Sequence, residues 1–189
     1  MSAVAILGGA FDPPHVGHVA LAADASRHFG LDRLLVRVVE DPGHKEVDTP
    51  AAIRLLLTEL AFAPIDGAEV ALDPFARTVD SLAALALDDP LFLIGADEFA
   101  AFLTWKEPER VLELARLGVA TRPGTDRAAL EAVRARLTRP ERVELFAIEP
   151  FDVASSEIRD RIAAGEPVDG MLPAAVAAEI RRLALYGAS

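Results

Sequence analysis

Cysteine is absent from the 189-residue chain. Its absence excludes disulfide bridges, zinc sites built on thiolates and a cysteine nucleophile, and it is compatible with a reducing compartment. Long apolar runs are missing too, since no stretch of about 18 apolar residues could form a membrane-spanning helix. The N-terminus also lacks the basic and apolar regions of a secretory signal. We therefore expect a cytoplasmic protein that does not associate with membranes.

Positive charge is scarce and is carried almost entirely by arginine. The chain has 19 Lys+Arg against 30 Asp+Glu, which gives a formal net charge of −11. Such a surface repels nucleic acid, so nucleic acid is not an expected partner. A ligand that carries phosphates would need a local concentration of positive charge. The sequence leaves open whether the chain forms a homo-oligomer.

Short apolar segments alternate regularly with amphipathic ones along the whole chain. Strands are expected at Ala3–Leu7, Leu34–Val39, Glu69–Leu72, Leu91–Ile94, Leu117–Ala120 and Val143–Ile148. The segments between them have helical spacing, including one that Thr49 would cap and one over Thr78–Leu87. This alternation predicts an α/β fold: a doubly wound parallel sheet in one Rossmann-like domain, residues 1–189, on which the C-terminal helices of about 153–189 pack. Ligands of such sheets bind beyond the carboxyl ends of the strands.

The loop after the first strand reads GGAFDPPHVGH, over residues 8–18. Its glycines let a backbone approach a phosphate closely, and the following helix start offers free N–H groups. His15 and His18 are two of only four histidines and share one helix face, from which imidazoles can donate to phosphate oxygens. Neither GxxxxGK[ST] nor GxGxxG is present, which argues against a P-loop kinase and a dinucleotide-binding dehydrogenase. The loop therefore predicts a polyphosphate site of another kind.

This loop resembles the GG(T/S)FDP…HxGH signature of bacterial nucleotidyltransferases that adenylylate nicotinate mononucleotide. The resemblance implies adenylyl transfer from ATP to that pyridine mononucleotide, with Mg²⁺ accompanying ATP and no dedicated metal site on the protein. It also implies that His15 and His18 contact the ATP phosphates. The remaining ATP-binding positions of the loop are Gly8, Gly9, Ala10, Phe11 and Gly17. Ala10 stands where the family has Thr or Ser, so a role there is through the backbone.

Two downstream segments resemble further phosphate-binding motifs of the same family. Pro42-Gly43-His44-Lys45 resembles P-P-H-K, which gives Lys45 a catalytic role over the transferring phosphates and places His44 at the acceptor. Val153–Arg159 (VASSEIR) resembles I-S-S-T-x-I-R, which assigns Ser155 and Ser156 to ATP binding and Arg159 to catalysis. Hydroxyl groups at a helix start and an arginine one turn later can bind the same anion.

Three other segments resemble the family's acceptor and nucleoside motifs. In Arg77–Leu82 (RTVDSL), Thr78 would cap a helix whose N–H groups meet the nicotinate carboxylate, and the residues before it depart from the family pattern. Trp105, the only tryptophan, would stack on the pyridine ring. Asp97, in I-G-A-D, would bind a ribose or the adenylate, and Arg122 begins an R-P-G that the family shares.

Each downstream residue also has an ordinary structural explanation, as a helix cap, a core aromatic or a surface charge. Other functions remain open as well. The nearest is an adenylyltransferase for nicotinamide mononucleotide or phosphopantetheine. A different class is a nucleotide-binding sensor without turnover, which the departures at Ala10, Gly43 and Ala154 favour.

Overall fold

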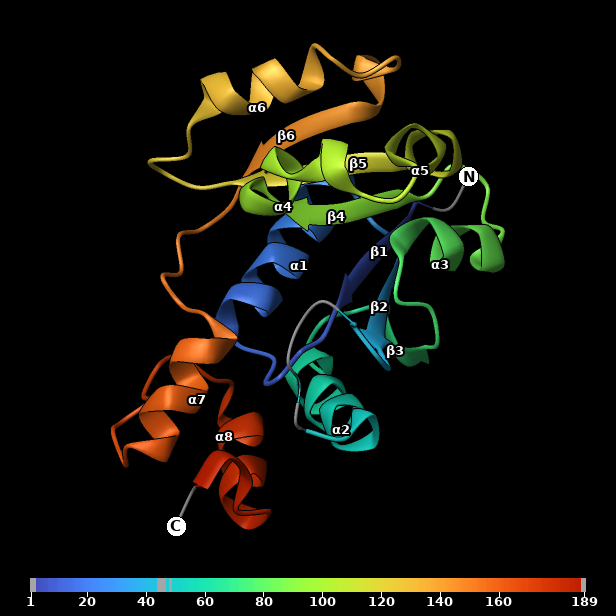
Figure 1. Cartoon of the computed structure of the whole chain (residues 1–189). Coiled ribbons are helices and arrows are strands. Elements are labelled where there is room, and N and C mark those ends of the chain that lie inside the picture. Colours follow the sequence, from blue (N-terminus) through green and yellow to red (C-terminus); the bar gives the residue numbers. More distant parts are fainter. Residues whose placement is uncertain (1–2, 44–46, 48, 188–189) are drawn as a thin grey trace.

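The computed structural model describes residues 3–43, 47 and 49–187 of the chain. Six strands form one sheet in the order β3-β2-β1-β4-β5-β6, and every neighbouring pair is parallel. The strands are β1 (Val4–Gly9), β2 (Arg33–Val39), β3 (Ala68–Asp73), β4 (Leu91–Gly95), β5 (Arg116–Thr121) and β6 (Val143–Ala147). The doubly wound parallel sheet expected from the sequence is confirmed (Figure 1).

Helices fill the connections between strands and follow the last one. They are α1 (Val16–Phe29), α2 (Ala51–Phe62), α3 (Thr78–Leu85), α4 (Ala96–Ala100), α5 (Pro108–Leu114), α6 (Arg127–Arg134), α7 (Ser155–Ala163) and α8 (Ala174–Arg182). Short 3₁₀ turns lie at η1 (Phe102–Thr104), η2 (Pro140–Arg142) and η3 (Leu185–Gly187). Within the described ranges, no helix is both long enough and apolar enough to cross a membrane.

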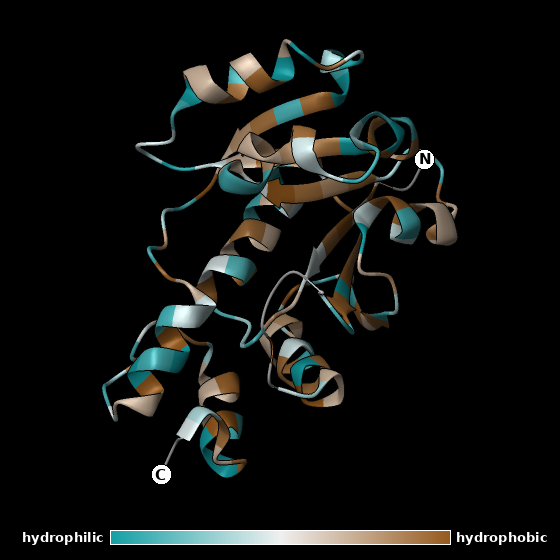
Figure 2. Ribbon diagram, viewed as in Figure 1, coloured by the Kyte–Doolittle hydropathy of each residue, from teal (hydrophilic) through white to brown (hydrophobic). Residues whose placement is uncertain are grey.

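Each face of the sheet is covered by its own set of helices. Alternate side chains of a strand point to opposite faces, so Ala5 and Leu7 join one buried cluster while Ile6 joins the other. The first cluster takes its helical residues from α1, α2, α7 and α8. The second takes them from α3, α4, α5 and α6. Figure 2 shows apolar colouring along the strands and mixed colouring on the surrounding helices, as expected for a sheet buried on both sides.

The C-terminal helices lie on the first face of the sheet, where α8 packs against α2. Ile158 and Ile162 of α7 and Val176 and Ile180 of α8 belong to the same buried cluster as Leu7. In Figure 1 these helices lie beside α2 and below the start of α1. The end of the chain is thereby brought close to the loop that follows β1.

Two helix caps differ by one residue from the sequence interpretation. The cap of α2 is Pro50 rather than Thr49, and the cap of α3 is Arg77, so that Thr78 is the first helical residue. In both cases the residue before the helix has an extended backbone, which moves the cap by one position. Helix α7 begins at Ser155, as expected from the sequence, and its cap is Ala154.

Candidate active site

A cleft of about 1140 Å³ opens at the carboxyl ends of the strands. It lies where β1 and β4 are neighbours, the point at which the strand order reverses and where sheets of this kind bind ligands. Its walls include the predicted site residues Gly8, Gly9, Ala10, Phe11, His15, Gly17, His18, Thr78, Asp97, Trp105, Arg122, Ser155, Ser156 and Arg159. The volume slightly exceeds the usual range for small-molecule sites, so there is room for a nucleotide and a second substrate.

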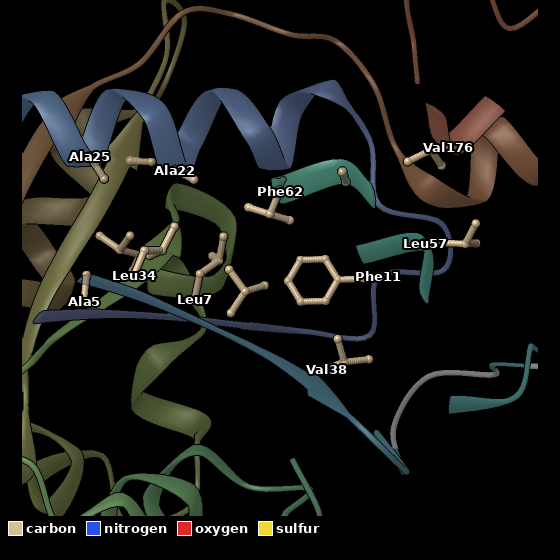
Figure 3. Packing of buried hydrophobic residues seen from close by; sticks show 14 of the residues in the cluster. Ala5, Leu7, Phe11, Ala22, Ala25, Leu34, Val38, Leu57, Phe62 and Val176 are labelled. Carbon is tan, nitrogen blue, oxygen red and sulfur yellow. The ribbon is translucent and has the colours of Figure 1, made fainter. Parts of the chain in front are cut away.

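The first loop turns sharply after Gly9 because Phe11 is folded into the core. Phe11 has a positive φ of 50° and is 2% exposed. Its ring meets Phe62 of α2 edge to face, with ring centroids 5.9 Å apart (Figure 3). A side chain at position 9 would lie 3.1 Å from that ring, which explains the glycine there. The Phe11 ring therefore holds the loop, and the residue can meet a ligand only through its backbone.

His15 and His18 are stacked at the start of α1, with ring centroids 3.7 Å apart. The His15 backbone N–H donates to Nδ1 of His18 at 3.2 Å, so a neutral His18 carries its proton on Nε2. Nδ1 of His15 is buried and has no hydrogen-bond partner in the described structure. Burial lowers the pKa of His15 to about 4, which leaves its imidazole neutral at pH 7. A side chain at Gly17 would lie 3.1 Å from the His15 ring, so the glycine of H-x-G-H makes room for the stack.

An arginine that the sequence interpretation missed holds this loop from below. Arg54 of α2 is 1% exposed, and its guanidinium donates to four backbone carbonyls. They belong to Ala10 (2.7 Å), Val39 (2.8 Å), Glu40 (2.7 Å) and Thr49 (3.0 Å). Burial lowers the pKa of Arg54 and the charge of Asp12 raises it. One buried cation thus joins the first loop, the end of β2 and the start of α2.

Asp12 connects the loop to the C-terminal helices through hydrogen bonds from both its side chain and its backbone. Its side chain is buried and accepts a hydrogen bond from the Tyr186 hydroxyl at 2.6 Å. Its backbone carbonyl accepts from Nη1 of Arg159 at 2.7 Å, and the carbonyl of Pro13 accepts from the Ser155 hydroxyl at 2.9 Å. Burial, followed by the bond to Asp12, raises the pKa of Tyr186, so the phenol stays a donor. Ser155 and Arg159 therefore support the loop as well as lining the cleft.

Asp97 and Arg122 come together on the β4–β5 side of the cleft. Nη2 of Arg122 lies 3.8 Å from Oδ2 of Asp97, and Nη1 donates to the carbonyl of Phe151 at 3.3 Å. The Asp97 side chain is 91% exposed, so this pair is weak and leaves the carboxylate accessible to a ligand. Asp97 lies in the first turn of α4, two residues beyond the cap at Gly95.

The opposite side of the cleft carries Trp105 and the start of α3. The Trp105 ring contacts Phe92 and Phe102, with centroids 6.4 and 5.3 Å away. Nζ of Lys106 reaches both oxygens of Asp80 on α3, at 2.9 and 3.0 Å, and ties this segment to the helix that Thr78 begins. Trp105 is thus anchored in the core by one edge while it still lines the cleft.

A buried acid shapes the segment between β3 and α3, where the sequence departs from the family pattern. Asp73 accepts from the Phe75 backbone N–H at 3.0 Å and from the Ser81 hydroxyl at 2.5 Å. These bonds hold the segment over the cleft and leave the Phe75 side chain 38% exposed at its mouth.

Some predictions cannot be placed. His44 and Lys45 lie outside the described residues. In the described part of the chain, no three His, Asp or Glu side chains gather in a way that could hold a metal ion.

Comparison with known proteins shows similarity over nearly the whole chain. Residues 6–161 match the family described as "Cytidylyltransferase-like". A protein of Bordetella avium is 35% identical over 194 residues, covering 98% of each chain, and one of Thermomicrobium roseum is 36% identical over 198 residues, covering 98% of this chain and 92% of its own. Both carry the name "Probable nicotinate-nucleotide adenylyltransferase".

A solved structure extends the similarity of fold to a distant relative. The nicotinic acid mononucleotide adenylyltransferase of Plasmodium falciparum, described as complexed with NaAD, superposes with a TM-score of 0.81 at 16% sequence identity. The superposition covers 100% of this chain and 99% of the other.

Proposed function

Since the chain belongs to the cytidylyltransferase-like family and, within it, to the nicotinate-nucleotide adenylyltransferases, we propose that it adenylylates nicotinate mononucleotide. The chain is a nucleotidyltransferase. The products would be nicotinate adenine dinucleotide and pyrophosphate, a step in NAD biosynthesis. The observation that carries the proposal is the stacked pair His15 and His18 at a helix start in the switch-point cleft.

The chemistry needs no proton transfer by the protein. An oxygen of the acceptor's 5′-phosphate bonds to the α-phosphorus of ATP while the bond from that phosphorus to the bridging oxygen of the β-phosphate breaks. The electron pair of the broken bond leaves with pyrophosphate. Because the attacking phosphate is already anionic at neutral pH, catalysis consists of positioning the two phosphates in line and stabilising charge.

The ATP phosphates would lie along the first loop. Backbone N–H groups of Gly9 and Ala10 and the imidazoles of His15 and His18 would donate to phosphate oxygens. A bound anion favours the charged form of an imidazole, so binding would raise the pKa of His15 from its value of about 4. Lys45 and Arg159 would neutralise further charge on the transferring phosphates. Ser155 and Ser156, at the start of α7, would also bind ATP, and Asp97 would bind its nucleoside.

The acceptor would lie against the other wall. Trp105 would stack on the pyridine ring, and the N–H groups at the start of α3, beginning with Thr78, would face the ring carboxylate. His44 and Arg122 would contact the rest of the mononucleotide.

Nucleotidyltransferases of this family generally use a divalent metal with ATP. We expect Mg²⁺ here, held chiefly by the triphosphate and water, because the described residues offer no carboxylate cage for it. When bound, the ion would draw charge from the phosphates and favour departure of pyrophosphate. A cytoplasmic location and the absence of nucleic-acid partners remain part of the proposal.

The test is pyrophosphate release with ATP and Mg²⁺ and one of three acceptors: nicotinate mononucleotide, nicotinamide mononucleotide or phosphopantetheine. The proposal predicts that release with the nicotinate compound is well above release with the other two. Preference for another acceptor would support adenylyl transfer but show that nicotinate mononucleotide is not the substrate. ATP binding without release, from folded protein, would identify a nucleotide-binding sensor.

A further inference from the structure

Arg37 lines the cleft, and its guanidinium has no partner among the residues that the structure describes. It lies in β2, and its Nε is buried without any hydrogen bond from or to the described residues. No carboxylate of the described structure lies within salt-bridge distance of it, whereas Arg33, four residues earlier on the same strand, forms a two-bond pair with Glu69 at 2.8 and 3.0 Å. A half-buried, unpaired guanidinium is costly, which indicates that its partner is a ligand.

The acid that could have neutralised Arg37 is engaged elsewhere. Asp73 ends β3, the strand next to β2, and both its oxygens accept hydrogen bonds, from the Phe75 N–H and the Ser81 hydroxyl. Those bonds hold the Asp73 carboxylate toward α3, and it forms no ion pair with Arg37. Arg37 is therefore left as positive charge available to an anion.

Arg37 and Trp105 flank a slot on the same face of the sheet. Arg37 is in register with Gly8 of β1, and a side chain at Gly8 would meet the Phe92 ring of β4 at 3.6 Å. Phe92 in turn contacts Trp105. Since strands are about 4.8 Å apart, the backbones of β2 and β4 are separated by roughly 10 Å, and the Phe92 ring lies over the glycine between them. A flat ring that stacks on Trp105 could lie above Phe92 and carry an anionic group toward β2.

The position of Arg37 separates it from the expected polyphosphate. Val36 and Val38 belong to the buried cluster on the face that α1 covers, and Leu35 belongs to the cluster on the opposite face. Because neighbouring residues of a strand face opposite sides, Arg37 is on the same face as Leu35. The histidine pair is at the start of α1, on the face away from Arg37. An anion at Arg37 is therefore best supplied by the acceptor.

We propose that Arg37 binds the carboxylate of the acceptor's pyridine ring and thereby selects nicotinate mononucleotide over nicotinamide mononucleotide. This inference rests on the proposed function and names a residue that determines the enzyme's specificity for the acceptor. A planar guanidinium matches a carboxylate with two parallel hydrogen bonds, whereas a neutral carboxamide offers one acceptor and no charge.

The experiment measures kcat/KM of Arg37→Met for both acceptors, together with KM for ATP. We expect kcat/KM for the nicotinate compound to fall about 10- to 100-fold, because a charge-assisted hydrogen bond is lost. KM for ATP and the value for the nicotinamide compound should change by less than about threefold, so selectivity collapses. Arg37→Lys should retain part of the preference. Arg33→Met makes the same change on the same strand, about 13 Å away, and should leave all values unchanged.

A binding measurement keeps this result distinct from the fate of the proposed function. Trp105 is the only tryptophan, so its fluorescence reports binding of each mononucleotide without ATP. If the wild-type protein does not turn over but binds the nicotinate compound more tightly and Arg37→Met removes that preference, the inference holds and the proposed reaction fails. Equal losses for both acceptors, a raised KM for ATP, an unchanged preference or no binding of either mononucleotide would each overturn the inference.

Discussion

The two walls of the cleft differ in how firmly hydrogen bonds hold them together. The phosphate wall, made of residues 8–18 with Arg54, Arg159 and Tyr186, is joined by hydrogen bonds from Arg54, Arg159 and Tyr186 to the first loop, and leaves only Nδ1 of His15 without a partner in the described structure. The acceptor wall, made of Arg37, Phe75, Thr78 and Trp105, leaves the Arg37 side chain unpaired within the described structure and Phe75 38% exposed. The backbone of the first wall is therefore held before any ligand binds, whereas the second wall depends more on interactions that a ligand would complete.

The difference matches the two tasks of a group-transfer site. A polyphosphate must be held in one geometry for in-line displacement, so its wall gains from rigidity. Recognition of the acceptor depends on contrast between similar molecules, and an unpaired buried group rejects a ligand that cannot satisfy it. Substitutions in the two walls should therefore have different consequences.

The largest effect is expected when both histidines of the phosphate wall are removed. His15→Ala combined with His18→Ala should lower kcat/KM by about 10³-fold or more, since each positioned donor contributes on the order of 10²-fold. Pyrophosphate release measures the loss. His28→Ala, a surface histidine paired with Glu144 at 2.8 Å, is the matched control and should retain full activity. Near-normal turnover in the double variant would remove the histidines from the catalytic machinery.

Arg54→Met should destabilise the fold more than any surface arginine. The change leaves four backbone carbonyls without the donor that a buried guanidinium supplies and is expected to lower the free energy of unfolding by about 3–5 kcal/mol. Urea denaturation followed by circular dichroism measures it. Arg182→Met, which breaks an exposed pair with Glu179, should change stability by less than about 1 kcal/mol. Similar values for the two variants would show that the phosphate wall is not held by this arginine.

Burial of His15 in its stack with His18 should make the free energy of unfolding depend on pH. Its pKa is lowered to about 4 in the folded chain, so the unfolded chain binds the extra proton first as pH falls. Stability due to this neutral imidazole is complete above about pH 6.5 and falls by about 3 kcal/mol between pH 6.5 and 4. Denaturation of the ligand-free protein across that range, compared with His15→Gln, measures the difference. Parallel curves for the two proteins would contradict the burial of a neutral His15.

The smallest effect is expected on the acceptor wall. Phe75→Ala removes a ring that is 38% exposed, so the free energy of unfolding should change by less than about 1 kcal/mol. KM for the mononucleotide should rise several-fold while KM for ATP stays constant. An equal rise in both constants would show that Phe75 does not belong to one wall alone.

The parts of the molecule that could be predicted from sequence are those encoded locally. The six strands follow from short apolar runs, and the GGAFDPPHVGH loop combines glycines and two histidines within one turn. The caps at Thr49 and Thr78 were wrong by one residue because the choice depends on the backbone of the preceding residue, which residue type does not determine.

The supports of the site could not be predicted because they join distant segments. Arg54 appears in the sequence as one charge in an apolar helix, which marks it as unusual, but its acceptors lie at residues 10, 39, 40 and 49. Tyr186 reaches Asp12 across 174 positions of the chain. Arg37 looks like an ordinary exposed residue of a strand until the sheet places it beside Gly8 and opposite Trp105.

The most direct test of the account follows the α-phosphorus of ATP. The protein is incubated with Mg²⁺, nicotinate mononucleotide and ATP labelled at that atom, and the products are separated by chromatography. The account predicts that the label moves into nicotinate adenine dinucleotide, with one pyrophosphate released for each dinucleotide formed. Label that stays in ATP, although the folded protein binds both substrates, would contradict it.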